Sequence, residues 1–127
     1  MLKKKLYLPY KTVTSSKKEI NFNFLLDENT ESPLIVNEII SILLSRISNE
    51  IKITNPSNGD IIQALCMALA IRCRIIEYDI NKIELMVNNT LKQAFKDAKD
   101  AVSTFLASRA FWAARQLDPA CLLCLFQ

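Results

Sequence analysis

Residues that break regular structure are scarce in this chain. Its 127 residues include a single glycine, Gly59, and four prolines. An all-β sandwich needs a turn about every 8–12 residues, so this composition does not suit one. Half of the residues are apolar, which is enough for a sizeable core at this length. We therefore expect long helices within a single domain, residues 1–127.

Histidine is absent altogether. Because imidazole is the commonest general base and the commonest metal ligand, its absence excludes Ser-His-Asp and Cys-His catalysis within one chain. Carboxylate and lysine chemistry remain open, but we expect no enzyme and assign no catalytic residue and no cofactor. The net charge of +3 is a mild excess, below that of a typical obligate nucleic-acid binder.

The four cysteines read best as free thiols. The N-terminal "MLKKKLYLPY" has no apolar stretch after its basic residues, so it does not resemble a secretory signal, and we expect a reducing, cytoplasmic location. Cys66 and Cys73 lie two helical turns apart, about 10 Å by the rise per residue, so they do not suit one tetrahedral metal site. Cys121 and Cys124 form a CxxC without the βαβ context of a redox motif. We expect no metal site.

Apolar residues alternate with polar ones near the N-terminus, a period of two that predicts strands. We expect a β-hairpin over residues 1–26, although its turn lacks the usual Asn-Gly pair. A two-stranded hairpin is marginal alone and should pack on helices. The alternating residues are Leu6, Leu8 and Tyr10, then Ile20, Phe22 and Phe24.

The first helix should begin at Ser32 and Pro33, which suit an N-cap and a first helical position. It should run to about Asn49. Residues 51–53 alternate Ile-Lys-Ile and could form a third short strand, before Pro56 marks a loop. The apolar face of this helix consists of Val36, Ile40, Leu43 and Ile47, widened by Ile35, Ile39 and Ile42.

The second helix should begin near Ser57, which starts a capping box, and should reach about Tyr78. It is apolar nearly all round, which predicts a central position with buried leucines, Leu65 and Leu69 among them. Asp79 can cap a third helix, whose apolar stripe continues to Phe105. A second capping box in that stretch could kink the third helix.

Together these patterns predict an α+β fold that is mostly α. An N-terminal β-hairpin, with or without a third short strand, should pack on a three- or four-helix bundle over residues 32–118. Residues 119–127 form an apolar C-terminal tail. No apolar stretch is as long as the ~20 residues that a helix needs to cross a bilayer, so we expect no membrane span.

Two arginines stand near the end of the apolar second helix. At about 100° per residue, Arg74 falls on the polar side, whereas Arg72 falls among apolar residues such as Leu65 and Leu69. A guanidinium there either pairs with free carbonyls or an acid such as Asp79, or anchors an interface.

The last 17 residues, 111–127, are rich in aromatic and leucine side chains, which either complete the core or form a binding surface. They also contain no lysine, isoleucine or asparagine, so this segment is either an alanine-rich helix or a stretch with a different coding history. With Arg72, the candidate partner-binding residues are Trp112, Leu122 and Phe126.

The N-terminal hairpin carries six lysines against Glu19 alone. Such a strand could contact phosphates and stack on single-stranded bases, although lysines also keep an edge strand soluble. The candidate nucleic-acid-binding residues are Lys3, Lys4, Lys5, Tyr7 and Tyr10.

These observations favour a small non-enzymatic interaction or assembly protein that is oligomeric, with a protein partner or a second copy of itself. The alternative is a nucleic-acid-binding accessory factor that uses the basic hairpin.

Overall fold

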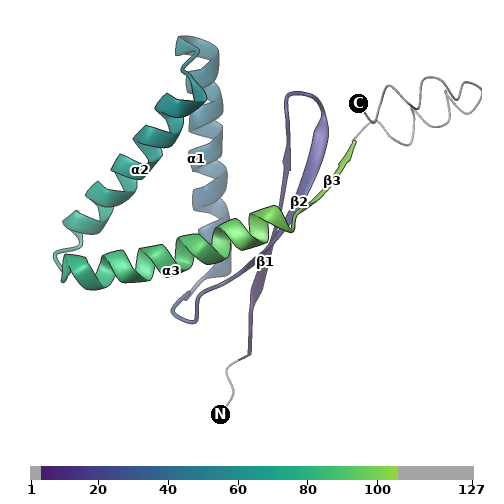
Figure 1. The fold of residues 1–127 in the computed structure, drawn as a ribbon. Coiled ribbons are helices and arrows are strands. Elements are labelled where there is room, and N and C mark those ends of the chain that lie inside the picture. Colours follow the sequence, from purple (N-terminus) through teal and green to yellow (C-terminus); the bar gives the residue numbers. More distant parts are fainter. Residues whose placement is uncertain (1–3, 106–127) are drawn as a thin grey trace, which may run out of the picture.

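The computed structural model describes residues 4–105 (Figure 1). This part of the chain holds three helices and a three-stranded antiparallel sheet, so the predicted α+β, mostly helical class is confirmed. The elements are β1 (Tyr7–Val13), β2 (Lys18–Leu25), α1 (Pro33–Thr54), α2 (Asn58–Ile75), α3 (Ile80–Lys99) and β3 (Val102–Phe105).

Strands β1 and β2 form the predicted hairpin, with Tyr7 opposite Leu25. The rings of Phe22 and Phe24 stack with their centroids 5.3 Å apart. The period of two places one set of side chains on the face that is buried or half-buried, namely Leu8, Tyr10, Thr12, Ile20, Phe22 and Phe24.

The hairpin turn is built without glycine. The backbone N–H of Lys17 donates to the carbonyl of Thr14 (2.9 Å), and the N–H of Thr14 donates to the carbonyl of Lys18 (2.9 Å). Lys17 has a φ of 63°, which is the left-handed residue that a three-residue hairpin loop requires. A lysine therefore occupies a position that favours glycine.

The free edge of β1 is closed to further strands. Backbone hydrogen bonds at the two ends of the ladder show that the even-numbered residues of β1 face β2, so the odd-numbered residues point their backbone groups outward. Pro9 is one of these and offers no N–H, which explains how a proline is tolerated in the strand. Lys11, the next one, is exposed and pairs with Glu19 at 2.9 Å.

Helix α1 begins where its capping residues predict. The hydroxyl of Ser32 accepts a hydrogen bond from the N–H of Ile35 (3.3 Å), and Pro33 is the first helical residue. The helix continues to Thr54, however, so the predicted short strand at residues 51–53 is wrong.

The end of α1 explains this correction. Asn55 adopts the left-handed conformation (φ 47°), and its N–H donates to the carbonyl of Ile51 (3.1 Å). Pro56 disfavours the α conformation in the residue before it, so the helix stops there and not earlier. Up to that point each added residue gains one helical hydrogen bond.

Helix α2 has the predicted N-cap. The hydroxyl of Ser57 accepts a hydrogen bond from the N–H of Asp60 (3.1 Å). The helix ends at Ile75, earlier than the predicted Tyr78. Glu77 has a φ of 57°, and this left-handed residue turns the chain away from the helix axis.

Helix α3 is a single helix that passes the second capping box at Thr90 without a break. Asp79 caps it as predicted, because its carboxylate accepts a hydrogen bond from the N–H of Asn81 (3.0 Å). The helix ends at Lys99, so the predicted continuation to Phe105 is wrong.

Residues 102–105 form β3, which pairs antiparallel with β2 and gives the sheet order β1-β2-β3. Val102 lies opposite Asn21. Valine, threonine and phenylalanine favour strands, and the outer edge of β2 supplies a partner for them. The third strand therefore exists, but at residues 102–105.

The three helices lie as the sides of an open triangle, with the sheet beside α3 and the start of α1 (Figure 1). From the turn at Asn55, α1 and α2 diverge too far to pack along their lengths, since packed helices lie 8–10 Å apart. The predicted bundle is wrong in this respect. Within residues 4–105, the buried apolar residues are Leu8, Cys73 and Ile83.

The left-handed Lys17 generates a test of this fold. Left-handed backbone costs a residue with a Cβ about 1–2 kcal/mol, and glycine loses about 0.5–1 kcal/mol in added chain entropy. Lys17→Gly should therefore raise the free energy of unfolding by up to about 1 kcal/mol, measured by urea titration. The matched control is Lys18→Gly, in extended β2, which should lower stability. If both variants lowered the free energy of unfolding, the left-handed conformation of Lys17 would be contradicted.

Candidate interaction surface

Helix α2 exposes apolar side chains around its whole circumference. Cys73 is its one buried residue. Leu65 and Leu69, predicted to be buried, are 44 % and 42 % exposed, so that prediction is wrong for the chain alone. On another side lie the residues that we call the α2 stripe, spaced four apart: Met67, Ile71 and Ile75, all exposed. A helix that is apolar all round normally lies inside a core.

Helix α1 is covered on only part of its apolar face. Val36, Ile40 and Ile47 are half-buried, and the neighbouring hydroxyl of Tyr10 lies 3.2 Å from that of Ser41. The rest of the apolar arc is exposed. We call its central residues the α1 stripe: Ile35, Ile39, Ile42 and Leu43.

Charge divides the same two helices. From Glu19 to Ser45 the chain has only acidic charges, Glu38 of α1 among them. Helix α2 has no acid after Asp60 and ends in Arg72 and Arg74. The first half of α1, with the segment before it, thus carries only negative charge, and the end of α2 carries only positive charge.

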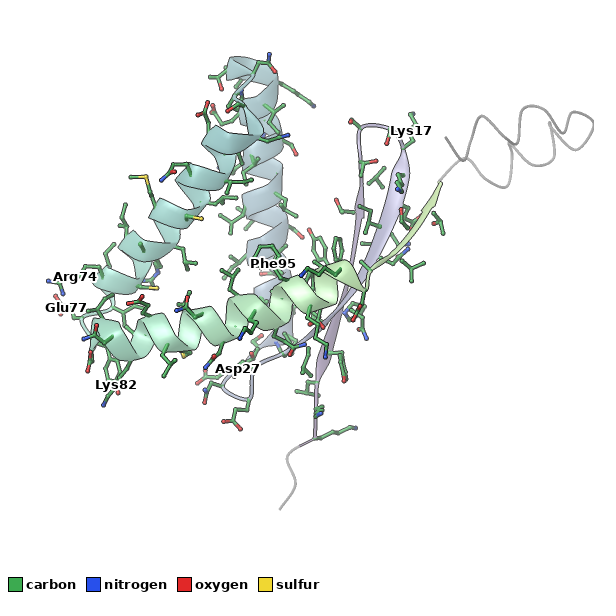
Figure 2. The ribbon with its side chains drawn as sticks, in the orientation of Figure 1. Lys17, Asp27, Arg74, Glu77, Lys82 and Phe95 are labelled. Atoms are coloured by element: carbon green, nitrogen blue, oxygen red, sulfur yellow. The ribbon has the colours of Figure 1, made fainter. Side chains whose placement is uncertain are left out.

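The structure places Arg72 on the exposed surface of α2. No hydrogen bond or ion pair joins its guanidinium to another of residues 4–105, so the acid considered as its partner, Asp79, does not pair with it there. Arg74 is also exposed and lies with Glu77 at the corner between α2 and α3 (Figure 2). The other candidate partner-binding residues, Trp112, Leu122 and Phe126, lie outside the described residues.

The basic hairpin does not gather its candidates on one surface. Lys4, Lys5 and Tyr7 are exposed, while Tyr10 is half-buried. Tyr7 and Tyr10 differ by an odd number of residues in one strand, so they lie on opposite faces of the sheet. Lys3 lies outside the described residues. A row of bases could not stack on both tyrosines at once.

Asp97 holds the sheet and α3 together, a role that the sequence did not reveal. One carboxylate oxygen accepts a hydrogen bond from the backbone N–H of Leu25 at 2.9 Å. The other oxygen accepts one from the side-chain amide of Gln93 at 3.0 Å. The spacing of Gln93 and Asp97 on one helix was a visible signal, but their partner lies 72 residues away in the chain.

A cleft of about 460 Å³ lies between the β2–α1 connection and α3. Asp27 and Lys82, two of the residues that line it, lie on the same side of α3 in Figure 2. Its remaining lining residues include Leu26, Leu85 and Met86. No polar or charged side chain in the described part of the chain is buried, so the cleft offers no shielded group for chemistry.

Within residues 4–105, no group of three or more cysteine, aspartate or glutamate side chains is placed to hold a metal ion. Over the same residues, no helix combines the length and the apolar character that crossing a bilayer requires. No family model, no curated protein and no solved structure matches this chain. The apolar faces of α1 and α2 are therefore the feature from which a role has to be argued.

The Asp97 contact generates a second test. Asp97→Ala leaves the N–H of Leu25 without its acceptor in a half-buried position. The loss should be about 1–3 kcal/mol in the free energy of unfolding, measured by denaturant titration. Asp100→Ala, three residues on and exposed, is the control and should change stability by less than about 0.5 kcal/mol. Equal losses in the two variants would remove Asp97 from its anchoring role.

Proposed function

We propose that this protein is a non-enzymatic interaction and assembly protein, and that the exposed apolar faces of α1 and α2 are its binding surface. The observation that carries the proposal is α2 itself. It is apolar on nearly all sides, yet a single one of its residues, Cys73, is buried. A helix of this composition is stable in water only when other helices surround it.

The energetic scale supports a role in binding. Fourteen large apolar side chains of α1 and α2 are exposed. Full burial of one such side chain is worth about 1.5–3 kcal/mol, so burying what remains exposed on a set of this size amounts to roughly 10 kcal/mol or more before entropic costs. Monomeric proteins seldom leave contiguous apolar patches above about 300–600 Å² exposed.

The absence of histidine from the whole chain also favours a role without catalysis. The described residues include no buried charge, and enzymes rely on such groups in a dry site. Binding alone, in contrast, needs only a large apolar surface with a polar rim.

The proposal predicts that the apolar faces are sensed by a hydrophobic fluorescent dye whenever no partner covers them. Ile39→Glu and Ile71→Glu, each placed in one stripe, should reduce association several-fold. At dilutions where both are monomeric, each variant should also bind several-fold less dye than the wild type. Dye fluorescence and sedimentation velocity, measured over a range of protein concentrations, report these two quantities.

Leu85→Glu is the matched control. Leu85 lies on α3 and is 63 % exposed, against 58 % for Ile71, but it belongs to neither stripe. It should leave association unchanged, and any dye that it displaces comes from the cleft that Leu85 lines. A wild-type chain that sediments as a monomer and binds no dye at any concentration would show that the stripes are covered within one chain, and the proposed function would fall.

A further inference from the structure

We infer that the occupant of the apolar surface is a second copy of this chain, and that α1 of each copy packs antiparallel against α2 of the other. This inference rests on the proposed function and names its partner. Four observations carry it: the exposed area, the closed sheet edge, the arrangement of charge and the separation of α1 from α2.

The exposed area suits a dimer. The apolar area of a large aliphatic side chain is roughly 60–120 Å², from its burial energy at about 25 cal/mol per Å². Fourteen such side chains, each roughly half exposed, present on the order of 400–800 Å² of apolar surface. A stable interface buries about 800 Å² on each partner, of which somewhat more than half is apolar. The seven residues of the two stripes supply about half of this apolar area, and their exposed neighbours bring it toward what a dimer buries.

The sheet does not offer an alternative route to self-association through β1. Its outward-facing backbone includes Pro9, which lacks an N–H, and this gap weakens strand addition there. The charge of Lys11 adds little, because it is paired with Glu19 of β2. Of the two edge strands, β1 is therefore a poor template, and the helices offer the larger apolar surface for association.

The charges of α1 and α2 make the surface self-complementary. The segment from Glu19 to Ser45 has no lysine or arginine, and its exposed acids include Glu31 and Glu38. The opposite charge stands at the end of α2, in Arg72 and Arg74. When α1 lies antiparallel to α2 of a second copy, the acidic start of one helix meets the basic end of the other.

A two-fold axis repeats this contact. In a symmetric dimer each contact occurs twice with the roles of the copies exchanged. Glu31 and Glu38 of each copy therefore face Arg72 and Arg74 of the other. The separation of α1 and α2 within one chain leaves each helix free to take a partner from outside (Figure 1). The α1 stripe and the α2 stripe are then covered together, and α2 gains the surrounding that its composition requires.

A charge-exchange experiment on the full chain tests the inference. One variant carries Arg72→Glu and Arg74→Glu, and a second carries Glu31→Lys and Glu38→Lys. Each variant alone opposes like charges in both symmetry-related contacts and should self-associate at least about tenfold more weakly than the wild type. An equimolar mixture restores opposite charges in both contacts and should form a heterodimer of near wild-type affinity.

Sedimentation velocity and fluorescence transfer between labelled copies are the measurements. The wild type should be a dimer that dissociates on dilution, and its unfolding midpoint should rise with protein concentration. Recovery of association in the mixture shows that each variant still folds, because an unfolded chain could not be rescued by another variant.

Three outcomes overturn the inference. A wild-type monomer that binds dye at every concentration keeps the proposed function but assigns the surface to a different protein. A monomer that binds no dye removes both proposals, since the chain's own residues then cover the surface. A dimer whose charge variants associate as tightly as the wild type excludes the antiparallel pairing of α1 with α2.

Discussion

The position of α3 against the sheet depends on one carboxylate. Asp97 accepts a hydrogen bond from the N–H of Leu25, a backbone group at the edge of β2 beyond the last residue that β3 covers. An unpaired N–H there would oppose the packing of α3 on the sheet. By satisfying it, Asp97 fixes the end of α3, and the chain then turns at Asp100 and enters β3 alongside β2. The contact between Asp97 and Leu25 thus helps to fix where α3 lies relative to the sheet.

The rest of the molecule divides into a part whose apolar side chains are covered and a part whose apolar side chains are exposed. One side of the sheet, one side of α3 and part of the apolar face of α1 bury or half-bury apolar residues, Leu8, Ile40 and Ile83 among them. The remainder of α1 and nearly all of α2 do not. The hydrophobic effect acts on this exposed surface as strongly as on a core, so the free energy that would stabilise a bundle in one chain is available for association between chains.

Local signals in the sequence predicted local structure well. Ser32, Ser57 and Asp79 cap the helices as expected, because an N-cap depends only on residues within one turn. The hairpin followed from its period of two. Strand β3 was missed because Ala101 and Phe105 continued an apolar stripe of helical spacing, and only the distant edge of β2 favoured a strand. For the same reason the pairing of Asp97 with Leu25 was beyond reach, since it joins residues far apart in the chain.

For the candidate surface, too, the local sequence pattern was not enough to predict the structure. The composition of α2 indicated that it should be covered, and that requirement still holds, but composition does not say which chain supplies the cover. Leu65 and Leu69 were expected to be buried and instead lie exposed in the single chain. Arg72, which looked out of place among apolar residues, finds no partner within residues 4–105. The periodicity of the sequence cannot explain either feature, because both depend on which residues pack against α2.

Pro9 has a consequence for the life of the newly made chain. A newly made chain with exposed apolar helices and an open strand edge is prone to form cross-β fibres. Proline at the outer edge of β1 interrupts the row of N–H groups on which such a fibre would grow. The exposed apolar surface of α1 and α2 is thus accompanied by protection against strand addition at the β1 edge of the sheet.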